Sequence, residues 1–134
     1  MRGSFVAIIL RVSLFLLGVL YIFIGFGFLT DPVGSGADFG ITPLAEAGAQ
    51  GLSSIRADLT SFFWVSAACL ILGSWKANAN LLNVGAALLG TVFLIRGFSV
   101  FADGTYEGWM MPMGVELLTA VLALAAARVL PRGD

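Results

Sequence analysis

Apolar residues along this chain gather into four long runs, separated by stretches rich in Gly, Ala and polar residues. The runs cover residues 5–29, 55–75, 81–102 and 110–130. Each run has about 20 residues or more, the length that a helix needs to cross roughly 30 Å of hydrocarbon. The pattern predicts an all-α integral membrane protein: one domain, residues 1–134, folded as an antiparallel bundle of four transmembrane helices.

The first run could be mistaken for a secretory signal peptide, because Arg2 precedes it. Its apolar stretch is longer than the roughly 7–15 residues of a signal core, and no small-x-small cleavage site follows closely. We therefore interpret residues 5–29 as a retained span. Arg11 lies about six residues inside this run, so its side chain either extends to the interface or is a buried functional arginine.

Residues 30–54 form the one sizeable outer loop that the pattern predicts. Asp31-Pro32 should end the first span, since proline disfavours helical geometry in the residue before it. Thr42-Pro43 resembles an N-cap with a first-turn proline, which predicts a short helix to about Ala47. Ser53 or Ser54 could cap the second span. The loop either covers the mouth of the bundle or is a plain connector.

Small residues indicate how the spans pack. Gly18 and Gly25 share a face of the first span, and such spacing lets a neighbouring helix approach closely. The connector 76–80 is short, so the second and third spans should be neighbours. In the last span, Ala120, Ala123 and Ala127 lie on the same helical face as Glu116. Because this face has small side chains, Glu116 should point into the bundle.

The composition supports membrane insertion and excludes several chemistries. The chain is 59% hydrophobic and 11% charged, with a mean hydropathy of +0.99, whereas soluble domains average about 25% charged residues. There is no histidine, Cys69 is the only cysteine, and the net charge is −1. The chain thus lacks the commonest general base and metal ligand, cannot form an intrachain disulfide, and has no basic patch for nucleic acid.

No nucleophile is paired with a histidine, and no phosphate-binding loop or dinucleotide fingerprint occurs. We therefore expect a non-enzymatic protein with no catalytic residues, no metal and no cofactor. Met110, Met111 and Met113 could supply thioethers to Cu(I), because soft ligands select that ion. With no Cys or His beside them, packing at the interface explains these methionines equally simply.

Basic residues predict the orientation in the membrane. Arg2, Lys76, Arg128 and Arg132 flank spans on the side of the termini, whereas the two opposite loops contain acidic residues and no Lys or Arg. The positive-inside rule places both termini in the cytoplasm.

Four charged residues then lie in the outer third of the bundle: Arg56, Asp58, Arg96 and Glu116. Arg96 and Glu116 each lie about 9–10 Å inside their helices, at matching depth. An opposite-charge pair at one level of a membrane is a candidate functional site. Asp58 has a second explanation, because a carboxylate in the first turns of a helix is stabilised by the helix dipole.

Two interpretations of this cluster stay open. Charge pairing offsets the cost of an isolated charge, roughly 2.5–3.5 kcal/mol at mid-membrane, so the cluster could only hold four helices in register. Alternatively it forms a polar or proton-accessible pocket, in which Glu116 titrates and Arg96 and Arg56 hold anionic ligand groups. Buried ion pairs are weak evidence for stability, which leaves room for the second interpretation.

The motifs Ile55-Arg56-Ala57-Asp58, Arg96-Gly97, Asp103-Gly104 and Glu116-Leu117 resemble those of a bacterial family of small four-span membrane proteins catalogued as a domain of unknown function. A looser likeness, based on span count, is to DoxX-like four-helix membrane proteins, some of which are linked to quinone or thiol redox chemistry. The resemblance implies a multi-pass protein of the bacterial inner membrane. It implies no reaction.

Three functions are compatible with these observations. The first is a structural or accessory subunit of a larger membrane complex, in contact with lipid and with other subunits or copies of itself. The second is a small-ligand carrier or binder that uses the Arg/Asp/Glu cluster, and the third is a quinone-associated redox protein. A subunit should expose glycine-rich faces outward, whereas a binder should enclose a polar cavity.

Overall fold

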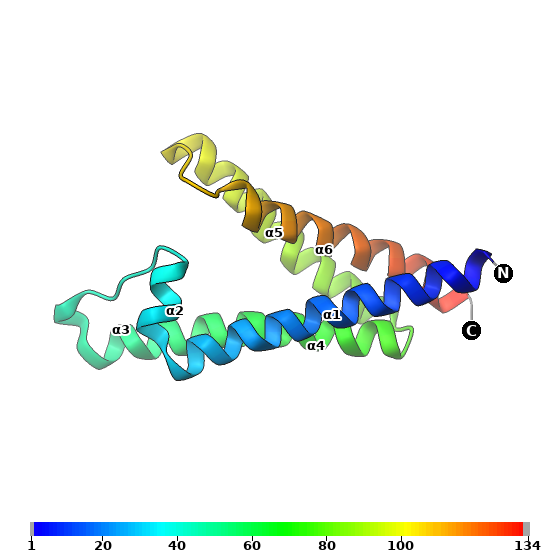
Figure 1. The fold of residues 1–134 in the computed structure, drawn as a ribbon, viewed down its shortest axis with the longest axis horizontal. Helices are drawn as coiled ribbons and strands as arrows, with labels where there is room; N and C mark the ends of the chain where they lie inside the picture. Colours follow the sequence, from blue (N-terminus) through cyan, green and yellow to red (C-terminus); the bar gives the residue numbers. More distant parts are fainter. Residues whose placement is uncertain (1, 133–134) are drawn as a thin grey trace.

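The computed structural model describes residues 2–132, and all regular secondary structure in that range is helical (Figure 1). Four segments are long and apolar enough to cross a membrane. The elements in chain order are α1 (Arg2–Thr30), α2 (Pro32–Asp38), η1 (Ala45–Ala47), α3 (Gly48–Ser54), η2 (Ile55–Leu59), α4 (Thr60–Trp75), α5 (Ala79–Asp103), α6 (Met110–Val129) and η3 (Leu130–Arg132).

Helices α1 and α4 form one closely packed pair, and two glycines of α1 make the close approach possible. A Cβ atom at Gly18 would collide with the Ile71 side chain, and one at Gly25 would collide with the Trp64 ring. The Trp64 Nε1–H group donates a hydrogen bond to the backbone oxygen of Ile22 at 3.2 Å. The predicted glycine face of the first span is therefore used inside the molecule.

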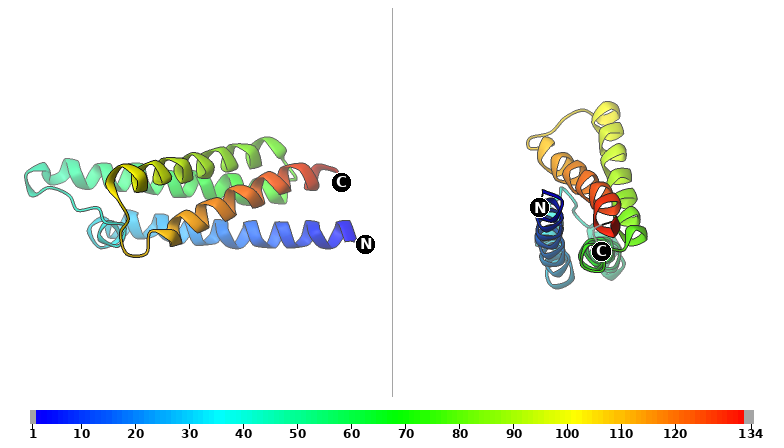
Figure 2. Two further views of the ribbon diagram at one scale, coloured as in Figure 1. Left: turned by 90° about the horizontal axis from the view of Figure 1, so that it is seen from above. Right: turned by 90° about the vertical axis from the view of Figure 1, so that its right-hand side faces the viewer.

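Helices α5 and α6 form the second pair, and α6 crosses the α1–α4 pair at an angle (Figure 2). The small-residue face predicted for the last span is buried: Ala120, Ala123 and Ala127 are at most 9% exposed, and Glu116 is 7% exposed. Leu82 and Leu89 of α5 are also buried. The turn between α4 and α5 is tight, as predicted, and the Asn78 side chain accepts hydrogen bonds from the first backbone N–H groups of α5.

The two pairs meet at one end of the molecule and spread apart at the other (Figure 1). The start of α1, the segment η3 and the α4–α5 turn lie at the first end, here called the closed end, where Leu10, Leu14 and Leu130 are buried in the core. Segment 31–54 and loop 104–109 lie at the opposite end, here called the open end. Burial in α5 stops at Leu89, and beyond it this helix diverges from the α1–α4 pair (Figure 1).

Segment 30–54 differs from the predicted loop because most of it is helical. Asp31 ends α1 as expected, and its side chain accepts a hydrogen bond from Gly34 N, which caps α2. No side-chain hydrogen bond from Thr42 caps η1, which begins after Leu44. The second long helix begins at Gly48 rather than at residue 55, and the Ser54 hydroxyl donates to Gln50 O within it. Ser54 therefore does not cap the span.

Candidate functional site

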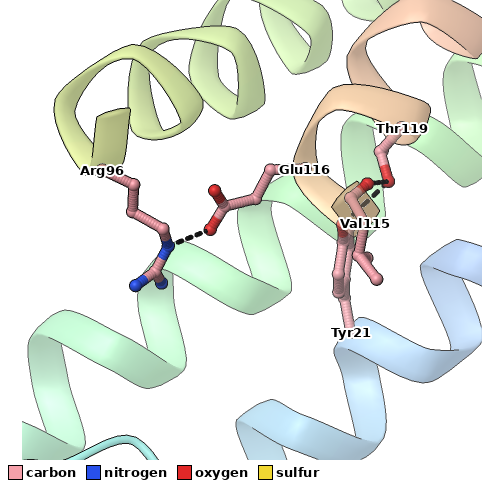
Figure 3. A network of polar contacts seen from close by, with 5 residues as sticks. All are labelled: Tyr21, Arg96, Val115, Glu116 and Thr119. Atoms are coloured by element: carbon pink, nitrogen blue, oxygen red, sulfur yellow. Dashed lines mark hydrogen bonds and ion pairs between the residues drawn. The ribbon is translucent and has the colours of Figure 1, made fainter. Parts of the chain in front are cut away.

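The candidate site is built around one ion pair between α5 and α6. Arg96 Nε donates to Glu116 Oε1 at 2.7 Å (Figure 3). The side chain of Glu116 is 9% exposed and that of Arg96 is 34% exposed. The two residues were predicted to lie at matching depth, and the structure confirms that they pair. Both stand on the open-end half of their helices, where the two helix pairs spread apart.

The pair leaves much of its hydrogen-bonding capacity unused. The second carboxylate oxygen, Glu116 Oε2, is buried and has no hydrogen-bond partner within residues 2–132. Arg96 engages the carboxylate through Nε alone, and its two terminal nitrogens turn away from Glu116 (Figure 3). An arginine that only served to neutralise a carboxylate would favour the bidentate geometry, in which two N–H groups bind both oxygens. Here Glu116 Oε2 receives no hydrogen bond from Arg96.

A second polar contact lies on the next turn of α6. The Thr119 hydroxyl donates to Val115 O at 2.7 Å, and the Tyr21 hydroxyl lies 2.9 Å from Thr119 Oγ1 (Figure 3). A threonine hydroxyl has a single hydrogen. Because that hydrogen is used for Val115 O, Tyr21 must be the donor to Thr119. This bond joins α1 to α6 about one helical turn from Glu116 (Figure 3).

A cavity of about 750 Å³ lies in the wedge between the two helix pairs, and we call it the central cavity. Arg96 and Glu116 both line it, together with residues of α1, α4 and the two open-end connections. Pockets that bind small molecules usually measure roughly 300–1,000 Å³ and combine apolar walls with a few polar groups. The central cavity has this size and this composition.

Aromatic rings make up much of the cavity wall. Tyr21, Phe62 and Phe63 line its inner part, while Phe39 and Tyr106 line the part formed by the open-end connections. The rings also contact one another: Phe39 and Phe63 meet edge to face, with centroids 5.9 Å apart. Side chains from α1, α4 and the segment after α2 therefore contribute to one surface.

Arg56 and Asp58 do not join the ion pair. Arg56 lines a separate cavity of about 500 Å³ with Leu29 and Trp64, and its Nε–H donates to Leu29 O at 3.0 Å. The carbonyl of Leu29 is one of the last four of α1, which have no partner within the helix. Arg56 thus caps the carboxyl end of α1, where a cation is favourable.

Asp58 is exposed and forms no ion pair or hydrogen bond within the described residues. Its predicted stabilisation by a helix dipole assumed a helix that begins at residue 55. The helix begins at Gly48 and continues through the π-helical turn η2, so Asp58 lies about three turns inside it. Because the dipole effect is confined to the first turn, that explanation of Asp58 is wrong.

The thioethers of Met110, Met111 and Met113, considered above as Cu(I) ligands, do not face one common point. Met110 and Met111 are 68% and 77% exposed, whereas Met113 Cε lies 3.6 Å from the position of a Cβ atom at Gly97. Met110 and Met111 are therefore exposed, Met111 as part of the lining of the central cavity, while Met113 packs against α5. Among residues 2–132, no three His, Cys, Asp or Glu side chains group as ligands for a metal ion.

Sequence reasoning missed the aromatic wall and the Tyr21–Thr119 bond. The residues of that bond are 98 positions apart, and only the tilt between the helix pairs brings them together. One signal was present, since Tyr21 is the only tyrosine inside the four apolar runs, and a buried tyrosine hydroxyl needs a partner.

Comparisons of the chain with protein-family models, with curated proteins and with solved structures found no match. The resemblance to the four-span family of unknown function, and the looser likeness to DoxX-like proteins, stay predictions.

Proposed function

We propose that this chain is a multi-pass protein of the bacterial inner membrane, an antiparallel four-span bundle with both termini in the cytoplasm. Four segments of sufficient length and hydropathy support the spans. The distribution of basic residues supports the orientation, because Lys76, Arg128 and Arg132 belong to the closed end and none lies in loop 104–109. The open end then faces the outside.

We further propose that the protein is a non-enzymatic binder or carrier of a small amphipathic molecule, which occupies the central cavity. The observation that carries this proposal is Glu116, a residue that lines the cavity and whose buried oxygen Oε2 has no hydrogen-bond partner among residues 2–132. Leaving a buried polar acceptor unsatisfied costs about 1–3 kcal/mol, and more for a charged group. A ligand that donates to this oxygen, or carries positive charge beside it, removes that cost.

The packing of the glycines supports a binder over an accessory subunit. Gly18 and Gly25 pack against α4, and Gly85 packs against Cys69 and Leu70, so these faces serve contacts within the chain. A subunit that used them for assembly would present them to a partner instead. The accessory-subunit role and the quinone-associated role stay predictions, since no contact in the structure favours either.

The test is native mass spectrometry of the protein purified in a mild detergent. We expect a small molecule to be retained by the parent protein and lost from Val115→Trp, because Val115 lines the cavity and the indole would fill it. Val121→Trp is the matched control: this valine lies on the same helix but is 54% exposed and does not line the cavity. Equal retention by both variants, or no retained molecule in the parent, would contradict the proposal.

A further inference from the structure

The ionisable residues around the central cavity are mostly acidic. Asp38, Glu107 and Glu116 contribute three carboxylates, and Arg96 is the one cationic side chain among the lining residues. With all four ionised, the formal charge of the lining is −2. Clefts lined by one sign of charge concentrate ligands of the opposite sign. The cavity therefore attracts cations and repels anions, even though an arginine lies on its wall.

The three acidic residues lie at different depths in the cavity. Asp38 at the end of α2 and Glu107 in the 104–109 loop are both exposed and lie at the open end. Glu116 is 7% exposed and lies deeper, on α6. A cation entering from the open end thus meets two solvated carboxylates first and the buried carboxylate last.

The aromatic wall favours the same class of ligand. Five aromatic side chains line the cavity: Tyr21, Phe39, Phe62, Phe63 and Tyr106. The negative face of an aromatic ring attracts a cation, and the attraction strengthens when water is excluded. Rings combined with a carboxylate are suited to an organic cation that has an apolar body, because the body packs on the rings while the charge lies near the carboxylate.

Two groups in the site could each recruit a ligand, and burial decides between them. The terminal nitrogens of Arg96 could hold an anion, but its side chain is 34% exposed, so the chain does not enclose these nitrogens. Glu116 Oε2 is buried and lacks a partner in the described part of the chain, so it needs a hydrogen-bond donor or a positive charge that these residues do not supply. Arg56, the second arginine that the sequence suggested for anionic groups, lines a different cavity.

We propose that the central cavity binds an amphipathic organic cation whose charge lies beside Glu116 Oε2 while Arg96 keeps its bond to Oε1. The inference rests on the proposed function, since it assigns a ligand class to the same cavity.

The test uses two probes of nearly the same shape and opposite charge, tetraphenylphosphonium and tetraphenylborate. Equilibrium dialysis against the full chain in detergent measures the dissociation constant of each, and the Val115→Trp variant gives the background from micelles. We expect tetraphenylphosphonium to bind at least about tenfold more tightly than tetraphenylborate. Glu116→Gln should weaken tetraphenylphosphonium about tenfold or more, whereas Glu46→Gln, an exposed acid outside the cavity, should leave it unchanged.

Each contrary result points to a different failure. If tetraphenylborate binds more tightly and Val115→Trp blocks it, the ligand class is wrong while the binding function stands. If Glu116→Gln leaves tetraphenylphosphonium binding unchanged, the assigned position of the charge is wrong. If neither probe binds above the Val115→Trp background, and native mass spectrometry retains nothing, the proposed function itself fails.

Discussion

The two ends of this molecule are built from the same four helices but packed in opposite ways. At the closed end, small side chains of α6 let the helices touch: Ala123 and Ala126 are fully buried, and Leu82 and Leu130 fill the remaining space. At the open end the same helix carries Glu116, and the facing part of α5 has no buried residue beyond Leu89. The closed end is a core, and the open end is a cavity.

The contrast shows how one helix pair can serve both stability and a site. Alanines bring α6 close to its neighbours, and the angle at which α6 crosses the α1–α4 pair then separates the helices progressively along its length (Figure 1). The packing at the closed end therefore sets how far apart the helices lie at the open end. Polar side chains replace the alanines there, and the Arg96–Glu116 pair joins α5 to α6 where apolar contact ends.

The two ends should differ most in whether a reagent added outside the cell can reach them. In a Cys69→Ser background, a cysteine at Ala37 or Thr105 should react with a membrane-impermeant thiol reagent added to intact cells, whereas a cysteine at Asn80 should not. All three positions are exposed, so only the side of the membrane decides the reaction. Labelling at Asn80 with none at Ala37 would reverse the proposed orientation.

Removing the basic member of the ion pair should have the next largest effect. Arg96→Leu leaves Glu116 buried with no partner, and breaking one side of a buried pair costs about 3–5 kcal/mol. Because Arg96 is partly exposed, we expect a loss of unfolding free energy near the lower end, about 3 kcal/mol. SDS-induced unfolding in mixed micelles, followed by circular dichroism, measures it.

The double variant Arg96→Leu/Glu116→Leu is the control for that measurement. Replacing both members removes the uncompensated charge, so it should recover most of the lost stability. If the single variant is as stable as the parent, the two side chains do not pair in solution.

Two glycine substitutions compare the ends at the level of packing. A Cβ atom at Gly73 would lie 2.9 Å from Leu82 Cγ and 3.2 Å from Leu82 N at the closed end, whereas one at Gly114 meets nothing within 4 Å. Gly73→Ala should lower the unfolding free energy by about 1–3 kcal/mol, since backbone must shift to make room. Gly114→Ala should leave it unchanged or raise it by up to about 1 kcal/mol, since alanine favours the helix and meets no neighbour there. Equal effects in the same unfolding assay would mean that the ends do not differ in packing.

The sequence predicted correctly those features that depend on the periodicity and length of individual helices. The four long apolar helices follow from the length of the apolar runs. The burial of Glu116 follows from the alanines on its face, and the Arg96–Glu116 pair follows from equal depth on consecutive helices. Helix periodicity and rise are local properties, so they can be read from the residue pattern.

The remainder depends on angles between helices, which no local pattern encodes. The cavity requires Tyr21 on α1 and Phe63 on α4 to face Glu116 on α6. Arg56 was grouped with Glu116 because both lie near the open end, yet it bonds to the end of α1 instead. Helix α3 was missed because its residues, rich in Gly, Ala and Ser, form no apolar run.

The most direct test of a ligand-binding carboxylate is Glu116→Gln, with stability and ligand retention measured on the same sample. Glutamine keeps an oxygen to accept from Arg96 Nε, and no protein group within residues 2–132 is bonded to Oε2. We therefore expect normal abundance in the membrane, a change in unfolding free energy below about 1 kcal/mol, and loss of the molecule detected by native mass spectrometry. A variant that is clearly destabilised yet retains its ligand would contradict this account, because Glu116 would then serve the fold rather than the cavity.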